Sequence, residues 1–235
     1  MKIMKKFMDW YQGNNDRETE PPRGGIRRVG YVLLNYSGKL VVVNLLFLLC
    51  CIPVVTIPSA VTALNVFVGK LFRTGYGVEL SDYFAEFRTG LLKRLPLGVL
   101  SGFLGFYAYY LLSLANNFRG NGQADILTGM GIAVAAVAMV LGAWLFILAS
   151  MLELPCRHLI RNACILMAVE WKSSLLVLLE VVLFWECVLL FAPWTLLPFL
   201  LAGPVLCQLL VCSVLIPAVK RRVVEPYEAR MGRKE

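Results

Sequence analysis

Residues 40–69 contain no charged side chain, and Lys39 and Lys70 bound this apolar stretch. A run of this length is longer than a buried helix of a soluble protein needs and reaches the ~20 residues of a membrane-spanning helix. Pro53 and Pro58 interrupt it near the middle. Proline removes a backbone donor and disfavours helix in the preceding residue, but it fits the first turn of a helix. We therefore expect two helices, with a hinge from Pro53 to Pro58 between them.

Later apolar segments repeat the pattern. The chain is 59% hydrophobic and 16% charged, against about 45–50% and about 25% in soluble domains. Its mean hydropathy is +0.71. These values predict an all-α, polytopic integral membrane helix bundle of about six transmembrane helices, the first two forming a proline-broken hairpin. After that hairpin, the expected spans are 98–114, 126–152, 173–191 and 197–218.

The distribution of basic residues predicts the topology. If residues 40–73 cross the membrane twice, 22 of the 23 Lys and Arg residues lie on one side and Arg119 alone lies on the other. A single crossing divides them more evenly, so the positive-inside rule favours the hairpin over a re-entrant segment. The expected organisation is a cytoplasmic basic segment at 1–28, one transmembrane domain at 29–218 and a cytoplasmic basic tail at 219–235.

The net charge of +8 indicates membrane topology and anionic lipid rather than a nucleic-acid partner, because the class is a membrane protein. Lys220, Arg221 and Arg222 are the candidates for contact with anionic lipid. Met1–Tyr11 is either a short interfacial helix or a frayed basic tail. It has no apolar core of the kind that a signal peptide carries. The seven cysteines show no paired spacing, so no disulfide framework is expected.

Two amphipathic segments, 81–97 and 157–172, are expected on the inner face. The first places Phe84 and Phe87 beside Arg88, and Ser81 is its expected N-cap. The second carries Arg157 and Arg161. These five aromatic and basic residues are the candidate docking residues.

A few polar residues lie within the predicted spans. Glu180 and Glu186 are candidates for function because ionisable groups are costly in a membrane. Six residues apart on a helix, they point about 120° away from one another, so they are not a paired carboxylate site. Glu180 is either a proton or cation coupling residue or the partner of a polar group on another helix. Asn44, Asn65 and Gln208 are better explained by interhelical hydrogen bonds.

Motifs of catalysis are not found in the sequence. It has no Gly-rich phosphate loop, HExxH or GxSxG motif, and the sole histidine, His158, has no second ligand nearby. We expect neither an enzyme, nor a metal site, nor a cofactor. Gly98, Gly102 and Gly105 follow a GxxxG-like spacing that permits close approach of another helix, in this chain or in a partner.

The run NLLFLLCCIPVVTIPSAVTAL at 44–64 and the segment SDYFAEFRTGLLKRLPL at 81–97 resemble the YesL-like family of bacterial membrane proteins, a domain of unknown function. Pro58 and Asn65 depart from its pattern, which often has glycine and an aromatic residue there. The resemblance implies a protein of the cytoplasmic (inner) membrane of a Gram-positive bacterium, of a kind often encoded near carbohydrate-uptake ABC transporters and sugar-degrading enzymes. It implies no established reaction and no site residues.

Two functions follow as hypotheses. The first is an accessory partner of a carbohydrate ABC uptake system, binding an ABC permease or a regulatory membrane protein through the two inner segments. The alternative is a small-solute or ion transporter acting on its own, with Glu180 as the coupling residue and Asn44, Asn65 and Gln208 along the route. Few polar groups converge in the spans, which favours the first.

Overall fold

The computed structural model describes residues 25–74, 78–118 and 122–227, and throughout these ranges the regular structure is helical. The predicted Met1–Tyr11 helix and most of the predicted cytoplasmic segment 1–28 lie outside the described residues. The elements are α2 (Ile26–Cys50), η1 (Val54–Thr56), α3 (Ile57–Thr74), α4 (Leu80–Lys93), α5 (Leu95–Asn117), α6 (Gly122–Met151), α7 (Cys156–Val169), α8 (Trp171–Leu190), α9 (Leu196–Val219) and η2 (Lys220–Val224).

Six of these helical stretches are long and apolar enough to cross a membrane within the described ranges. They coincide with the six predicted spans, so the all-α polytopic class is confirmed. The ends differ slightly from the prediction. Helix α2 begins at Ile26 and is kinked at Tyr36, whose φ of −125° and ψ of 22° are not helical. At the other end, α9 continues through the π-helical turn η2, so the predicted tail begins as helix.

The hinge between the first two spans is a short 3₁₀ turn rather than an open loop. Pro53 is extended and precedes η1. The Thr56 hydroxyl donates to the Cys50 carbonyl at 2.5 Å. Because the last carbonyls of a helix lack backbone donors, this bond satisfies one of the groups left at the end of α2. Helix α3 then begins at Ile57, with Pro58 in its first turn.

Helix α3 is the centre of the molecule. It packs against α2, α4, α6 and α9. In the most apolar 18 residues of this span 61% of the residues are buried inside the protein, against 11% in α8. Phe67 and Leu71 of α3, together with Trp144 of α6 and Leu215 of α9, are wholly enclosed. The indole of Trp144 donates to the Ser174 hydroxyl at 3.0 Å, which gives its buried N–H an acceptor.

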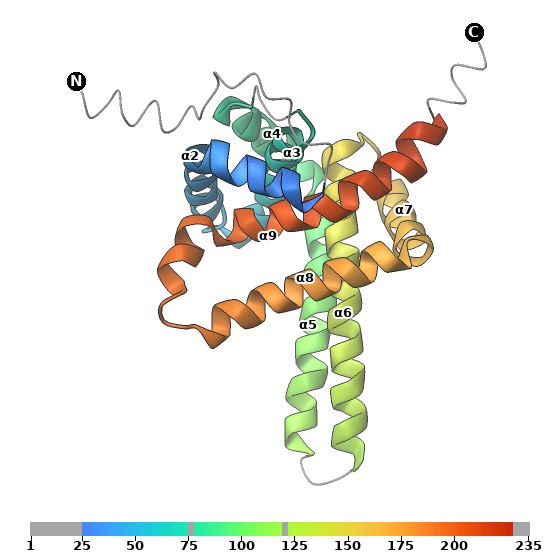
Figure 1. The fold of residues 1–235 in the computed structure, drawn as a ribbon. Coiled ribbons are helices and arrows are strands. Elements are labelled where there is room, and N and C mark those ends of the chain that lie inside the picture. Colours follow the sequence, from blue (N-terminus) through green and yellow to red (C-terminus); the bar gives the residue numbers. More distant parts are fainter. Residues whose placement is uncertain (1–24, 75–77, 119–121, 228–235) are drawn as a thin grey trace.

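The spans do not run parallel to one another. Helices α5 and α6 pair along their length and project away from the rest, whereas α8 and α9 run across the base of this hairpin at a steep angle (Figure 1). Large apolar side chains such as Phe103, Phe106 and Tyr109 of α5 are exposed. Such surface is compatible with a lipid bilayer, where apolar side chains need no protein partner.

Candidate functional site

The candidate site lies where α4 and α7 meet, at the end of the molecule that the charge distribution predicts to be the inner face. Helix α4 begins at a capping box in which Glu79, not Ser81, is the N-cap and Asp82 returns the bond. The expectation of a Ser81 cap was wrong. The Glu79 carboxylate accepts the bond from the backbone amide of Asp82, and the Ser81 hydroxyl donates to the Glu79 carboxylate instead. Lys70 pairs with Asp82 at 2.8 Å, and this hydrogen bond lowers the pKa of Asp82.

Helix α4 is held by one face only. Tyr83 and Gly90 are buried against the core, and Phe87 is half-buried and stacks on Tyr83. Burial raises the pKa of the Tyr83 phenol. Phe84 is 40% exposed, with one edge contact to the Tyr83 ring, and Arg88 is exposed. The outer face of α4 therefore presents an aromatic and a basic side chain.

Helix α7 is amphipathic in the same manner. Its buried residues Leu159, Ala163 and Leu166 recur at the spacing of one helical face. Arg157 and Arg161 lie exposed on the opposite side. The structure therefore places four of the five candidate docking residues on exposed faces, with Phe87 turned partly inward.

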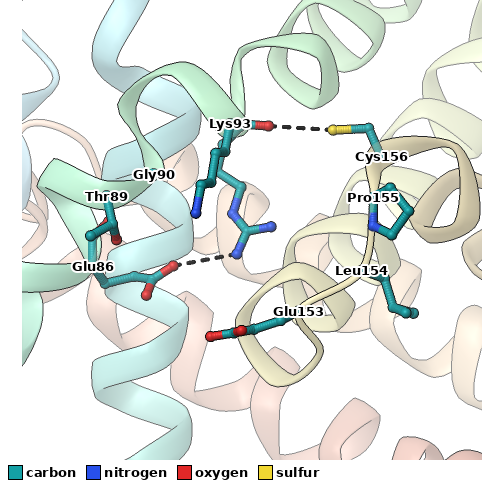
Figure 2. A pocket seen from close by; sticks show the side chains of 9 residues that line it. Glu86, Thr89, Gly90, Lys93, Glu153, Leu154, Pro155 and Cys156 are labelled. Atoms are coloured by element: carbon teal, nitrogen blue, oxygen red, sulfur yellow. Dashed lines mark hydrogen bonds and ion pairs between the residues drawn. The ribbon is translucent and has the colours of Figure 1, made fainter.

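A cavity of about 440 Å³ lies between the end of α4 and the segment 153–156 that leads into α7 (Figure 2). Glu86, Thr89 and Lys93 enter it from α4, and Glu153 and Cys156 line the other side. Figure 2 shows the two carboxylates directed into the space between these segments. The pocket was not predicted from sequence, because it depends on how the ends of three helices meet.

Two bonds across this pocket join α4 to the other helices. Arg94, 9% exposed, donates to the Ala149 carbonyl in the last turn of α6 at 2.7 Å and lies 3.4 Å from a Glu86 carboxylate oxygen. The Cys156 thiol donates to the Lys93 carbonyl at 3.3 Å. Each bond satisfies a carbonyl that a helix end leaves without a backbone donor.

Asn44 lies in the span α2 and completes a broken hydrogen-bond ladder in α9. Pro204, inside α9, cannot donate to the carbonyl four residues earlier, which is that of Leu200. The Asn44 amide donates to this carbonyl at 2.8 Å, and its oxygen accepts from the Val205 amide at 3.2 Å. Its polar groups are therefore used within the protein.

Asn65 and Gln208 are also engaged with one another. The Gln208 amide donates to the Asn65 side-chain oxygen, which joins α3 to α9. The Asn65 amide nitrogen is buried and has no hydrogen-bond partner among the described residues. This pair is separate from the Asn44 contact, so the structure does not gather the predicted intramembrane polar residues into one site.

Glu180 and Glu186 differ in their surroundings. Glu186 is exposed. One carboxylate oxygen of Glu180 is enclosed and has no hydrogen-bond partner in the part of the chain that the structure describes. Within the described residues, the hydrogen bonds of Asn44, Asn65 and Gln208 go to partners other than these two acids.

An ion-pair cluster that sequence reasoning did not find lies at the ends of α7 and α9. Glu170 is 5% exposed. It accepts from Arg222 at 2.6 Å and from Arg221 at 2.7 Å. These bonds, the one from Arg222 first, lower the pKa of Glu170. Two of the three predicted lipid-binding cations thus have a partner within the chain. The sequence offered one signal for this cluster: Glu170 directly precedes the span α8, and the basic pair directly follows the span α9.

The three glycines of the predicted packing stripe have different environments. A Cβ added at Gly98 would lie 1.9 Å from Cγ of Pro58, so α5 approaches the start of α3 closely there. Within the described residues, a Cβ at Gly102 or Gly105 would meet no heavy atom within 4 Å. Of these three glycines, Gly98 is therefore the one that lets another described helix approach closely. No cluster of three metal-ligating side chains occurs among the described residues.

Comparison with protein families gives one match. Residues 40–111 match the family described as "Protein of unknown function, DUF624". This stretch is therefore similar to the DUF624 family. YesL-like proteins are members of it, so the resemblance seen in the sequence is confirmed. The DUF624 match runs from the middle of α2 through α3 and α4 into α5, and it includes Pro58, Gly98 and the α4 side of the pocket. No curated protein and no solved structure matches the chain.

Proposed function

We propose that this multi-pass membrane protein is an accessory partner of a carbohydrate ABC uptake system, docking on its permease or on a regulatory membrane protein. The partner is inferred from the YesL-like resemblance, whose members are often encoded beside such systems. We propose the bacterial cytoplasmic membrane as its location, with both termini inside, because this arrangement keeps nearly all basic residues on one side. We also propose that it catalyses no reaction.

The observation that carries this proposal is the joint between α4 and α7. Each helix is anchored by one face. The Cys156 to Lys93 bond connects their ends, and the Arg94 to Ala149 bond joins the end of α4 to the last turn of α6. Phe84 and Arg88 of α4 and Arg157 and Arg161 of α7 are exposed. We propose that they form one docking surface, which we call the α4–α7 platform. Aromatic residues and arginine are enriched in the contacts that dominate protein interfaces. Such a platform suits a partner segment that offers carboxylates and apolar side chains.

Affinity purification tests this function. The tagged protein is isolated from its native membrane in mild detergent, and co-purifying proteins are identified by mass spectrometry. The double variant Phe84→Ala/Arg161→Glu should lower recovery of the permease about tenfold, which corresponds to about 1.4 kcal/mol. Phe106→Ala/Lys220→Glu is the matched control, because it removes an exposed aromatic and an exposed cation outside the platform. Equal recovery with both double variants, or no permease with the unmodified protein, would contradict the proposal.

A second candidate function, transport, has one observation in its favour. The enclosed Glu180 oxygen without a partner is the kind of intramembrane group that marks ion or proton pathways. The transport hypothesis is disfavoured by Asn44 and Gln208, whose polar groups form hydrogen bonds between helices. Proteoliposomes carrying Glu180→Gln should lose proton-coupled flux if the chain transports, whereas Glu186→Gln should retain it. Equal flux in both variants would remove Glu180 from any route.

A further inference from the structure

The size and charged lining of the pocket between α4 and the 153–156 segment are not explained by docking of a protein partner. Its volume of about 440 Å³ lies within the roughly 300–1,000 Å³ of small-molecule sites. It is lined by charged groups of both signs. Lys93 and Arg94 lie at the end of α4, Glu86 lies two turns earlier on the same helix, and Glu153 lies on the segment across the pocket. A ligand that fits must satisfy both kinds of group.

The basic side of the pocket contains a buried donor with no acceptor. Arg94 is nine-tenths buried, and its Nε has no hydrogen-bond partner among the described residues. Leaving such a donor unpaired is costly. The Lys93 ammonium forms no ion pair with any described residue. A guanidinium and an ammonium that converge with unused donors are well suited to a phosphate group.

The start of α7 adds to this basic character. Pro155 is the N-cap of this 14-residue helix and provides no side-chain cap. Pro155 and Cys156 line the pocket, so the first turn of α7 lies at its wall. The free amides and the dipole at a helix N-terminus favour an anion. With Arg94 and Lys93, three separate features therefore favour negative charge at this position.

The two carboxylates of the pocket, those of Glu86 and Glu153, disfavour a simple inorganic anion, because they would repel it. Glu153 makes no ion pair with any described residue, and Glu86 is held only by the 3.4 Å contact with Arg94. Carboxylates accept hydrogen bonds from hydroxyl groups. We propose that the pocket binds a phosphate ester of a polyol, with the phosphate at Lys93, Arg94 and the start of α7 and the hydroxyls at Glu86 and Glu153. The ester is either a soluble sugar or glycerol phosphate or the headgroup of phosphatidylglycerol.

Calorimetric titration tests this site on the full chain in nanodiscs of phosphatidylcholine. Glycerol 3-phosphate and glucose 6-phosphate are the probes, and inorganic phosphate and glucose are the chemical controls. If the ligand is a soluble ester, at least one of the two probes should bind saturably, and Lys93→Gln should weaken it at least tenfold. Lys172→Gln, which changes an exposed lysine outside the pocket, should not. Glu153→Gln should weaken the ester more than it weakens inorganic phosphate. Because Lys93 and Glu153 are both exposed, these variants should fold.

Nanodiscs that contain phosphatidylglycerol distinguish the two sources of the ester. If the headgroup is the ligand, this lipid raises the unfolding temperature of the unmodified protein more than that of Lys93→Gln, and the soluble esters do not bind. The proposal is overturned if no ester and no lipid gives a response that depends on Lys93. It is also overturned if inorganic phosphate binds as tightly as the esters. Either result leaves the docking proposal unaffected, because that test measures partner recovery.

Discussion

Asn44 shows how one side chain can repair a defect in another helix. A proline in a membrane span leaves a carbonyl without a donor, and no water is present to supply one. The Asn44 amide provides the donor for Leu200, while its oxygen takes the Val205 amide. The polar residue of α2 and the proline of α9 therefore form one unit, although 160 positions separate Asn44 from Pro204 along the sequence.

Replacing Asn44 by leucine should lower the free energy of unfolding by about 1–3 kcal/mol, because two hydrogen bonds within the membrane are lost at up to about 1.7 kcal/mol each. In a Pro204→Ala background the residue-204 amide can donate to Leu200 itself. The same Asn44→Leu change should then cost less. Thermal unfolding of the four proteins in detergent measures this coupling. An equal cost in both backgrounds would show that Asn44 does not act through Pro204.

Alanine at Gly98 should destabilise the protein by about 1–3 kcal/mol, because its Cβ would overlap the Pro58 ring and overpacking of this kind forces backbone shifts. Gly102→Ala is the matched control, since its Cβ meets no described atom, and it should leave the unfolding temperature unchanged or slightly higher. The opposite order of unfolding temperatures would mean that α5 does not rest on the hinge.

At this scale, sequence predicted which residues are unusual but not what they contact. Polar residues within apolar spans are visible in any sequence, and interhelical bonding was the expected reason for Asn44. Its partners depend on tertiary packing, as does the pairing of Glu170 with Arg221 and Arg222. For the same reason, Gly98 could not be separated from Gly102 by spacing alone.

Among the elements, the end of α9 is fastened to the junction of α7 and α8 by the Glu170 ion pairs. Because the folded-state pKa of Glu170 lies below its ordinary value near about 4.3, its ionisation stabilises the fold above that pH. This contribution is lost as the pH falls through the lowered pKa, so it is absent in strong acid.

Glu170→Gln should therefore cost about 1–2 kcal/mol at pH 7, a modest value because both arginines are half-exposed. The difference in unfolding temperature between this variant and the unmodified protein should shrink as the pH is lowered below about 4. Glu225→Gln, an exposed acid on the same helical extension, is the control and should show little change. A difference that does not vary with pH would mean that the charge of Glu170 is not responsible.

Helix positions were predicted well from sequence because prolines and charges mark where apolar runs stop. The amphipathic segments were also visible, since Leu159, Ala163 and Leu166 recur at helical spacing. Details of the ends were less accessible. Glu79 rather than Ser81 caps α4, and α9 continues into η2. Both outcomes depend on which of several competing local hydrogen bonds is more stable.

At the scale of the whole molecule, the six spans predict that both ends of the chain lie on one side of the membrane. Alkaline phosphatase, which is active only outside the cytoplasm, can be fused after residues 120, 155 and 235. The fusion at 120 should be active and the other two inactive, because only the loop between α5 and α6 carries a single basic residue, Arg119. Activity at 155 would require one of the four spans before it, α2, α3, α5 or α6, not to cross.

The number of spans follows from composition and length, whereas their directions do not. Apolar side chains of a membrane protein can face either lipid or another helix, so hydropathy does not state which helices pair. Nothing in the runs of leucine and valine in α8 and α9 indicated that they would run across the base of the α5–α6 hairpin (Figure 1). The pocket arises where the ends of α4, α6 and α7 meet, and hydropathy does not indicate that meeting either.

The projecting α5–α6 hairpin also has a practical consequence for labelling. At 1.5 Å per residue, the 30 residues of α6 extend about 45 Å, so Gly122 at its start is remote from the pocket, which lies beyond its last turn. If the proposed topology holds, an epitope or a fluorophore inserted between α5 and α6 would report the presence and orientation of the protein from the outer surface of the membrane. Cells could then be sorted by surface staining while the inner machinery stays unmodified.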